Sequence, residues 1–306
     1  MAKISVCLAR CVSYDIQVLQ PFIQEQLDIL GVPTRLSGKR ILLKPNLISA
    51  GAPSLACSSP QFTAAVAASF LCRGASVGLG DSPAFGTAAQ VLKRQGFREV
   101  LTGLAVDLVP FRTPVVKTLD CGVRVAIAAE ALDCDCFVNL PRIKAHEQMG
   151  TTMAVKNVFG IVVGARKAWL HMRHGGSHQL FAQMILGLQQ LLPSPLVLAD
   201  GIEVMNRRGP MKGSSLMLGC LAASKSAVAL DRAMLEVLEI DKRRVPLAVA
   251  ATEEGICGSS VADLEFPQLM PEVFAGSGFT IPATLSPVRF QPCRYLRSSL
   301  KRMFTA

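Results

Sequence analysis

The stretch RILLKPN (residues 40–46) is an apolar run that ends in a polar cluster, as a buried strand does at its carboxyl end. Further along, Ser59-Pro60 supplies a helix cap and a proline at the first helical position, and the predicted helix runs to about Arg73. A second apolar run, residues 76–79, leads into Gly80-Asp81-Ser82-Pro83. A strand, a helix and a strand in this order predict a unit with parallel strands.

The same alternation extends on both sides of this unit. It predicts an α/β fold, a mostly parallel sheet with flanking helices, in one body or in two lobes around a cleft. We assign residues 1–280 to this domain and residues 281–306 to a basic tail. Further strands are predicted at 3–9, 106–111, 115–119, 123–128, 136–140, 196–199 and 247–251, and further helices at 16–30, 87–95, 153–160, 177–192 and 227–238.

Composition narrows the class of protein. The chain has 306 residues, of which 50% are hydrophobic and 18% charged, which excludes general disorder. A net charge of +10 permits an anionic partner. Aromatic residues make up only 6%, too few for the stacking surfaces that bind single-stranded nucleic acid, so nucleic-acid binding is disfavoured.

Two further features bear on location. The uncharged stretch 181–199 contains three glutamines and two prolines, so we expect a buried helix followed by a strand and no transmembrane segment. No secretory signal is apparent, and the ten cysteines contain no Cys-x-x-Cys pair. They predict buried thiols in a cytoplasmic protein, with no iron–sulfur cluster bound by this chain alone. The tail residues 294–304 fit either an ordinary basic helix or a segment that docks on a membrane or a partner.

Four polar clusters follow predicted strands: Lys44-Pro45-Asn46, Gly80-Asp81-Ser82-Pro83, residues 142–146, and Asp200-Gly201-x-Glu203. Ligands of open α/β sheets bind at the carboxyl ends of the strands. Ordinary turn chemistry would explain each cluster taken singly. If they form one site, Lys44, Asp81, His146 and Asp200 should line a common cleft.

Residues 142–178 carry six Lys or Arg against one acid, Glu147, and all four histidines lie in this region. Such a segment suits a carboxylate or phosphate ligand, although a solvated basic face is the alternative. His171, His174 and His178 have helical spacing, but Gly175-Gly176 interrupts it. We therefore expect one metal ligand here rather than a three-histidine site.

Several of these blocks together resemble the family called domain of unknown function 362. They are residues 41–47, 80–83, 137–146, 154–160, Asp200-Gly201 and Gly209-Pro210, and the block from His146 to Gly160 is the most specific. The likeness covers about residues 1–255. Members are often joined to ferredoxin-type iron–sulfur segments, which this sequence lacks, so a ferredoxin-like partner is one implication of the resemblance.

The block is also similar to the nickel-pincer lactate racemase family. There, a His acts as general acid/base, a Lys ten residues later holds the pincer cofactor, and a later His binds nickel; His146, Lys156 and His171 match this spacing. The place of the family's second catalytic His is taken by Asp81 and Ser82, so racemisation by two bases is not expected. The resemblance implies a divalent metal or a nickel-type organometallic cofactor, whose identity the sequence leaves open.

We therefore predict a small-anion site. The expected catalytic residues are His146, Lys156 and Asp81. The expected ligand-binding residues are Lys44, Asn46, Ser82, Lys144 and Asn157, and the expected metal-binding residues are His171, Asp200 and Glu203. His146 is the first candidate for the acid/base because the ordinary pKa of histidine lies nearest to neutral pH.

Two functions remain open. The first is a metal- or cofactor-dependent enzyme, an isomerase or an oxidoreductase, that acts on a small anion. The second is a non-catalytic redox partner or metal carrier related to the iron–sulfur members of the family. In a purely structural alternative, Lys156 pairs with an acid such as Glu203 and only closes the cleft.

Overall fold

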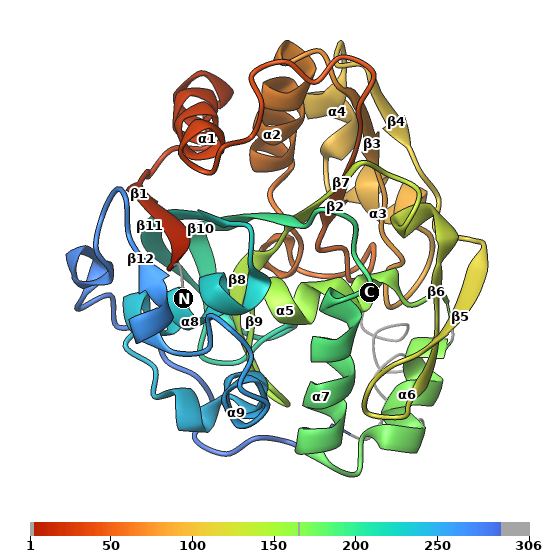
Figure 1. Cartoon of the computed structure of the whole chain (residues 1–306), viewed down its shortest axis with the longest axis vertical. Helices are drawn as coiled ribbons and strands as arrows, with labels where there is room; N and C mark the ends of the chain where they lie inside the picture. Colours follow the sequence, from red (N-terminus) through yellow and green to blue (C-terminus); the bar gives the residue numbers. More distant parts are fainter. Residues whose placement is uncertain (1–2, 165, 289–306) are drawn as a thin grey trace, which may run out of the picture.

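The computed structural model describes residues 3–164 and 166–288, and a ten-stranded sheet forms its centre (Figure 1). The main path of the sheet runs β12-β1-β11-β10-β7-β2-β3-β4, and β8 pairs with both β10 and β9. The strands are β1 Ile4–Arg10, β2 Arg40–Pro45, β3 Ser76–Leu79, β4 Val106–Leu108, β7 Cys136–Leu140, β8 Arg142–His146, β9 Gly150–Thr152, β10 Leu196–Asn206, β11 Ser214–Ser224 and β12 Leu264–Glu265.

The predicted mostly parallel sheet is confirmed. Strand β2 pairs in parallel with β3 on one side and with β7 on the other, and β4 and β10 extend this parallel part. The antiparallel pairs are those that β11 makes with β1 and β10, and the pair of β8 with β9. The carboxyl ends of β2, β3 and β7 therefore meet at one edge of the sheet.

Helices cover both faces of the sheet. In Figure 1, α1 to α4 lie on one face, and α5, α7, α8 and α9 lie on the other. Predicted caps are present: the Ser59 hydroxyl accepts a hydrogen bond from the Phe62 N–H at the start of α2. The helices are α1 Ile16–Ile29, α2 Pro60–Cys72, α3 Ala88–Arg94, α4 Phe97–Leu101, α5 Ala154–Asn157, α6 Arg166–His174, α7 His178–Gln189, α8 Ala227–Val237 and α9 Pro246–Glu253. Short 3₁₀ turns span Ser54–Ala56, Ala129–Ala131, Val158–Ile161, Lys242–Arg244, Val261–Asp263 and Pro271–Phe274.

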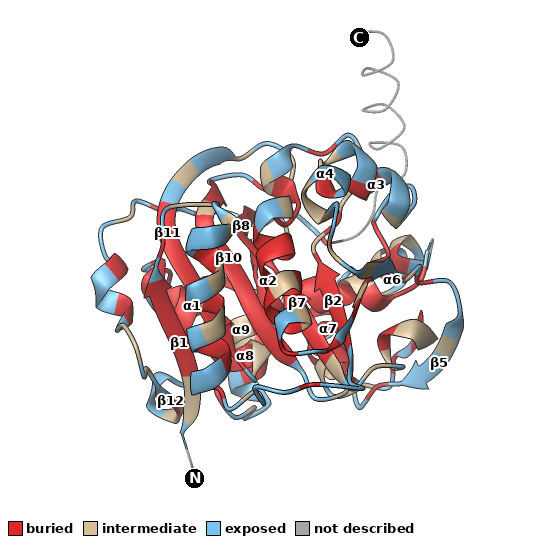
Figure 2. Ribbon diagram, turned by 90° about the horizontal axis from the view of Figure 1, so that it is seen from above, coloured by how far each residue is buried: buried red, intermediate tan, exposed pale blue. Residues whose placement is uncertain are grey.

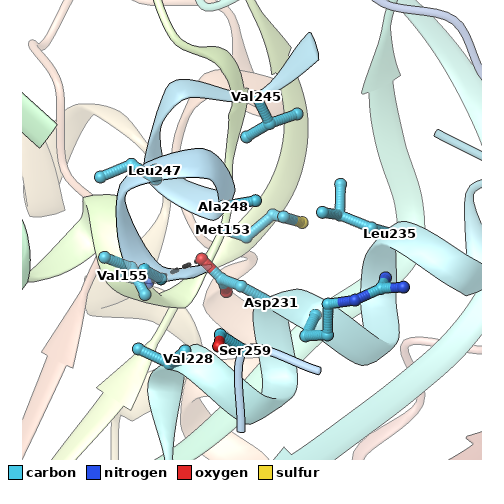
Figure 3. A pocket seen from close by; sticks show the side chains of 11 residues that line it. Met153, Val155, Val228, Asp231, Leu235, Val245, Leu247, Ala248 and Ser259 are labelled. Atoms are coloured by element: carbon cyan, nitrogen blue, oxygen red, sulfur yellow. Dashed lines mark hydrogen bonds between the residues drawn. The ribbon is translucent and has the colours of Figure 1, made fainter. Parts of the chain in front are cut away.

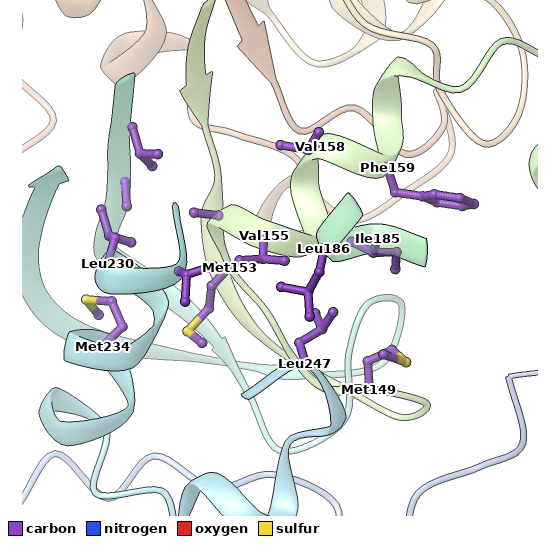
Figure 4. Close-up of a cluster of buried hydrophobic side chains, with 14 of the residues drawn as sticks. Met149, Met153, Val155, Val158, Phe159, Ile185, Leu186, Leu230, Met234 and Leu247 are labelled. Atoms are coloured by element: carbon purple, nitrogen blue, oxygen red, sulfur yellow. The ribbon is translucent and has the colours of Figure 1, made fainter. Parts of the chain in front are cut away.

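Each face of the sheet has its own apolar core, and the strands between them are buried (Figure 2). Figure 4 shows part of the core beneath α5, where Met153 and Val155 pack with Leu186 of α7 and Leu230 of α8. The short segment from α5 to the 3₁₀ turn Val158–Ile161 is thereby fixed in position. This segment carries Lys156.

Three predictions about elements are wrong. Residues 247–251 form helix α9 rather than a strand, because Pro246 starts a helix there and a short apolar run does not distinguish the two. Residues 142–146 form strand β8 rather than a loop after β7. Strand β10 does not end at Asp200-Gly201 but continues to Asn206, with a register shift between Gly201 and Glu203.

The strands predicted near 115–119 and 123–128 form a separate antiparallel hairpin, β5 Pro114–Thr118 and β6 Arg124–Ala128. Residues 289–306, which include the amphipathic part of the predicted tail, lie outside the described residues. Among the helices that are described, none has the length and apolar character needed to cross a membrane.

Candidate functional site

A cavity of about 450 Å³ lies at the carboxyl ends of β2 and β3, beside β8 and α5. Residues that sequence analysis placed in three different clusters line it together. Nine predicted site residues do so: Lys44, Asn46, Asp81, Ser82, Lys144, His146, Lys156, Asn157 and His171.

Lys44 and Asp81 form a buried ion pair at the base of the cavity. The Lys44 Nζ lies 2.9 Å from the Asp81 Oδ1, and the amine also donates to the Pro45 carbonyl. The Asp81 carboxylate accepts hydrogen bonds from the N–H groups of Leu47 and Ser82. Burial lowers the pKa of Lys44, and the Asp81 charge opposes this shift. Both charges are therefore satisfied within the protein, which is typical of an architectural pair.

Gly160 is packed directly against this pair. A Cβ added there would overlap the Lys44 amine and the Asp81 carboxylate, neither of which can move into solvent. The Gly160 carbonyl also accepts a hydrogen bond from the Ser82 N–H. The close approach explains why the segment that begins at Lys156 must carry glycine here.

A chain of amides connects the cavity wall. The Asn46 side chain donates to the Asn157 Oδ1 at 2.6 Å, and Asn157 donates to the Asn139 Oδ1 at 2.7 Å. Asn139 in turn donates to the Ala154 carbonyl. Asn139 is not among the predicted site residues, although a polar residue inside the apolar strand 136–140 is a usable signal. The chain joins β2, β7 and α5 into one rigid wall.

Two further lysine amines are occupied by protein oxygens. Lys144 donates to the Asn46 Oδ1 and to the Ala56 carbonyl. Lys167, which sequence analysis counted only as part of the basic segment, donates to the Ser82 and Gly160 carbonyls. Burial lowers the pKa of each lysine to about 7.

Lys156 differs from these lysines because its amine makes no hydrogen bond or ion pair with any of the described residues. The predicted alternative, a pair with Glu203, is wrong: the Glu203 carboxylate bonds to Arg142 at 3.2 Å and to Ser215 at 2.6 Å. Burial lowers the pKa of Lys156 to about 8. The amine therefore faces the cavity without a counter-charge from residues 3–164 and 166–288.

Asp231 of α8 holds the helix that carries Lys156. Its carboxylate accepts hydrogen bonds from the N–H groups of Ala154 (2.7 Å) and Val155 (3.1 Å), as Figure 3 shows in part. Burial raises the pKa of Asp231 to about 7 even though both hydrogen bonds lower it. The carboxylate takes the place of a cap at the start of α5.

His146 is held in one tautomer. Its Nδ1 accepts hydrogen bonds from the N–H groups of Gln148 (3.1 Å) and Met149 (3.3 Å), so the ring proton lies on Nε2. Burial, together with the charges of Lys156 and Lys144, lowers the pKa of His146 well below its ordinary value. As held here, the ring is a neutral hydrogen-bond donor. Its free nitrogen has no lone pair with which to act as the base expected from sequence.

His171 of α6 presents the opposite arrangement. Its Nδ1 lies 3.1 Å from the Val288 carbonyl, which can only accept, so the ring proton lies on Nδ1 and the lone pair on Nε2. Burial and Lys156 lower its pKa to about 4. The ring packs edge-on against Phe159. A neutral imidazole oriented in this way is suited to metal ligation.

The predicted metal set of His171, Asp200 and Glu203 is not brought together. His171 lines the cavity, whereas the two acids lie beside Arg142, whose Nη2 is 3.2 Å from Glu203 and whose Nε is 3.7 Å from Asp200. Tyr14 also donates to Asp200. Within the described ranges, no group of three or more His, Cys, Asp or Glu side chains could hold a metal ion. Asp200 therefore does not line the common cleft that we expected.

Comparison with known proteins agrees with the sequence motifs. The family model described as "Domain of unknown function (DUF362)" matches residues 41–236. The chain belongs to this family. It is 34% identical over 304 residues to the thylakoid-associated protein sll1697 of Synechocystis sp., covering 98% of this chain and 94% of that relative.

A solved structure shares the fold. The lactate racemase apoprotein from Thermoanaerobacterium thermosaccharolyticum superposes with a TM-score of 0.53 at 15% sequence identity. The match covers 76% of this chain, and the chain spans only 57% of that structure. The likeness to the racemase family is thus confirmed at the level of the fold.

Proposed function

We propose that the cavity binds a small anionic ligand, a substrate or an anionic cofactor, with Lys156 as the counter-charge. The observation that carries this proposal is the contrast among four lysines in one cavity. Protein oxygens satisfy the amines of Lys44, Lys144 and Lys167, whereas the Lys156 amine has no such partner among the described residues. Lys156 is only partly exposed, and an ammonium in such a place is costly unless it is paired; a bound carboxylate or phosphate supplies the pair.

Other groups in the cavity are suited to the same kind of ligand. The His146 Nε2–H is a neutral donor, and the Thr152 hydroxyl is buried without a hydrogen-bond partner among the described groups. The one lining carboxylate, Asp81, is already neutralised by Lys44. A volume of about 450 Å³ accommodates a small organic acid or a larger anionic cofactor.

As an enzyme, the protein would belong to the isomerases or oxidoreductases that act on small anions. In this proposal the protonated Lys156 amine binds the anion, and the bound negative charge stabilises the protonated form. His146 donates a hydrogen bond to an oxygen on which negative charge develops. Binding of the anion is thereby assigned to the lysine, and stabilisation of the developing charge to the histidine.

The residues present also fit part of a nickel-type organometallic group. The unpaired Lys156 amine would hold the organic part, and the Nε2 lone pair of His171 would face a metal. When bound, such a group would supply a Lewis-acidic centre. Asp81 does not fit the role of a second catalytic base, because its carboxylate is occupied by Lys44 and two backbone N–H groups.

We place this activity in the cytoplasm. The nine cysteines among the described residues are all free thiols, and Cys72 and Cys257 are exposed. Thiols of this kind suit a reducing compartment. A ferredoxin-like partner remains a prediction from the family resemblance.

The proposal is tested on protein purified from its native host and rapidly desalted. Intact mass, elemental analysis and mass spectrometry of the small molecules released on denaturation report adducts, metals and free ligands together. We expect an anionic molecule in wild type that is absent from Lys156→Met. Lys39→Met, which alters an exposed amine paired with Asp135, is the matched control and should retain it. Equal ligand content in wild type and Lys156→Met would contradict the proposal.

A further inference from the structure

Helix α6 has two chemically different faces. Lys167 and Leu170 are buried, and Lys167 and His171 line the cavity. The other face exposes Arg166, Trp169, Met172 and Arg173, which follow the spacing of one helical face. Trp169 is 50% exposed and Met172 is 42% exposed, which is unusual for side chains of this size. We call these four residues the outer face of α6.

The surroundings of this face are apolar and basic. Residues 166–174 contain no Asp or Glu. In both Figure 1 and Figure 2, α6 lies beside the β5–β6 hairpin, and the Val163 N–H donates to the Ala126 carbonyl, which ties the start of α6 to β6. The hairpin exposes Val116 and Arg124, and Asp120 is the exposed acid at its turn.

We propose that the outer face of α6 docks on an anionic lipid surface. Trp prefers the boundary between headgroups and acyl chains, and Met adds apolar area beside it. The two arginines flank this pair and can reach lipid phosphates while their stems stay apolar. The net charge of +10 favours approach to such a surface.

An acidic protein is the alternative partner, and the outer face of α6 is less suited to binding it. Two apolar side chains on one nine-residue helix offer far less area than a stable protein interface needs. Shallow insertion of a few apolar side chains, combined with charge attraction, is instead the usual basis of reversible membrane binding. The inference does not depend on the proposed function, because it concerns the face of α6 opposite the cavity.

The test uses Trp169, the one tryptophan of the chain, as its own reporter. The full-length protein is mixed with phosphatidylcholine vesicles with or without phosphatidylglycerol. We expect the emission to shift to shorter wavelength only with the anionic vesicles, and brominated acyl chains to quench it. Unchanged Trp169 emission in the presence of anionic vesicles would overturn the proposal, even if the protein sediments with them through another segment.

Variants then separate the apolar and charged contributions. Trp169→Ala/Met172→Ala and Arg166→Gln/Arg173→Gln should each weaken co-sedimentation with anionic vesicles at least about tenfold. The matched controls, Val12→Ser/Met217→Ser and Arg35→Gln/Arg243→Gln, alter exposed residues outside α6 and should bind within about twofold of wild type. Equal losses in test and control pairs would overturn the proposal, as would binding to soluble polyglutamate with no response of Trp169 to brominated lipid.

Discussion

At the scale of single residues, the cavity depends on how each buried charge is satisfied. The Lys44 amine is paired with a carboxylate, and the amines of Lys144 and Lys167 donate hydrogen bonds to neutral oxygens. Lys156 has no such partner among the described residues. Its isolated amine should therefore destabilise the ligand-free fold and favour anion binding, two effects that can be measured separately.

The first prediction concerns pH. The pKa of Lys156 is lowered to about 8 in the fold, so between about pH 8 and its ordinary 10.5 the unfolded chain binds more protons. Stability from this group therefore rises with pH across that window, whereas anion affinity falls as pH rises through about 8. At pH 7, ligand-free Lys156→Met should be more stable than wild type by about 1–3 kcal/mol, and this gain should shrink towards pH 10.

Urea unfolding at the two pH values measures this difference, with Lys39→Met as the control whose stability should change little. If Lys156→Met is instead less stable than wild type at pH 7, the amine has a structural partner and the functional assignment fails.

The second prediction concerns the His146 tautomer. Two backbone N–H groups face its Nδ1, so the ring should remain neutral and protonated on Nε2. Nitrogen chemical shifts of labelled histidine should show this form at the ordinary histidine pKa of about 6.5 and at higher pH, because the pKa of His146 lies well below that value. A ring that titrates near pH 6.5, or one protonated on Nδ1, would restore the general-base role.

The third prediction tests the packing of Gly160 against the Lys44–Asp81 pair. Gly160→Ala should lower the free energy of unfolding by about 2–4 kcal/mol, because the added Cβ displaces a buried ion pair. Gly176→Ala is the control: no atom lies within 4 Å of the added Cβ there, and its φ is not left-handed. Chemical denaturation measures the free energy of unfolding of both variants. Similar values would show that the Lys44–Asp81 pair can move aside.

At the scale of elements, the short helix α5 depends on its neighbours more than on its own length. A helix of four residues has no stability alone. Asp231 bonds its first N–H groups, and Gln189 of α7 donates to the Val155 carbonyl. The position of the Lys156 amine is therefore set by α7 and α8.

The fourth prediction follows from this dependence. Asp231→Ala leaves two buried N–H groups without acceptors, so it should cost about 1–3 kcal/mol and weaken anion binding as well. Asp15→Ala removes the corresponding cap of α1, far from the cavity, and should cost stability without changing anion affinity. Calorimetric titration with a small anion separates the two variants. Equal anion affinity in both would show that Asp231 does not position Lys156.

Elements were predictable where a local signal was strong. Helix α2 begins with the Ser59-Pro60 start signal, and the apolar runs of β2 and β3 end in polar turn residues. All three elements were predicted. Strand β8 was missed because it follows β7 after a single residue, Pro141, so no turn signal separates them. Strand β11 follows β10 after residues 207–213 and pairs with it as an antiparallel hairpin. It was missed because residues 214–224 contain no β-branched side chain, so the propensity signal of a strand is weak there.

At the scale of the whole molecule, parallel topology assembled most of the predicted site. Lys44 lies near the end of β2, Asp81 follows β3 and His146 ends β8, and the three meet because these strands end at one edge of the sheet. Asp200 and Glu203 did not join them because β10 continues past both residues, and Arg142 holds their carboxylates. The sequence could indicate which residues carry chemistry but not which charges the protein neutralises itself.

The most direct measurement of the central claim is chemical labelling of lysines by an anionic aldehyde. Pyridoxal 5′-phosphate and borohydride are applied to the full chain, and the modified peptides are mapped by mass spectrometry. We predict that Lys156 is modified first, faster as pH rises towards about 8, and that inorganic phosphate or small carboxylates protect it. Modification spread over exposed lysines such as Lys39 and Lys93, with Lys156 unmodified or unprotected by anions, would contradict it.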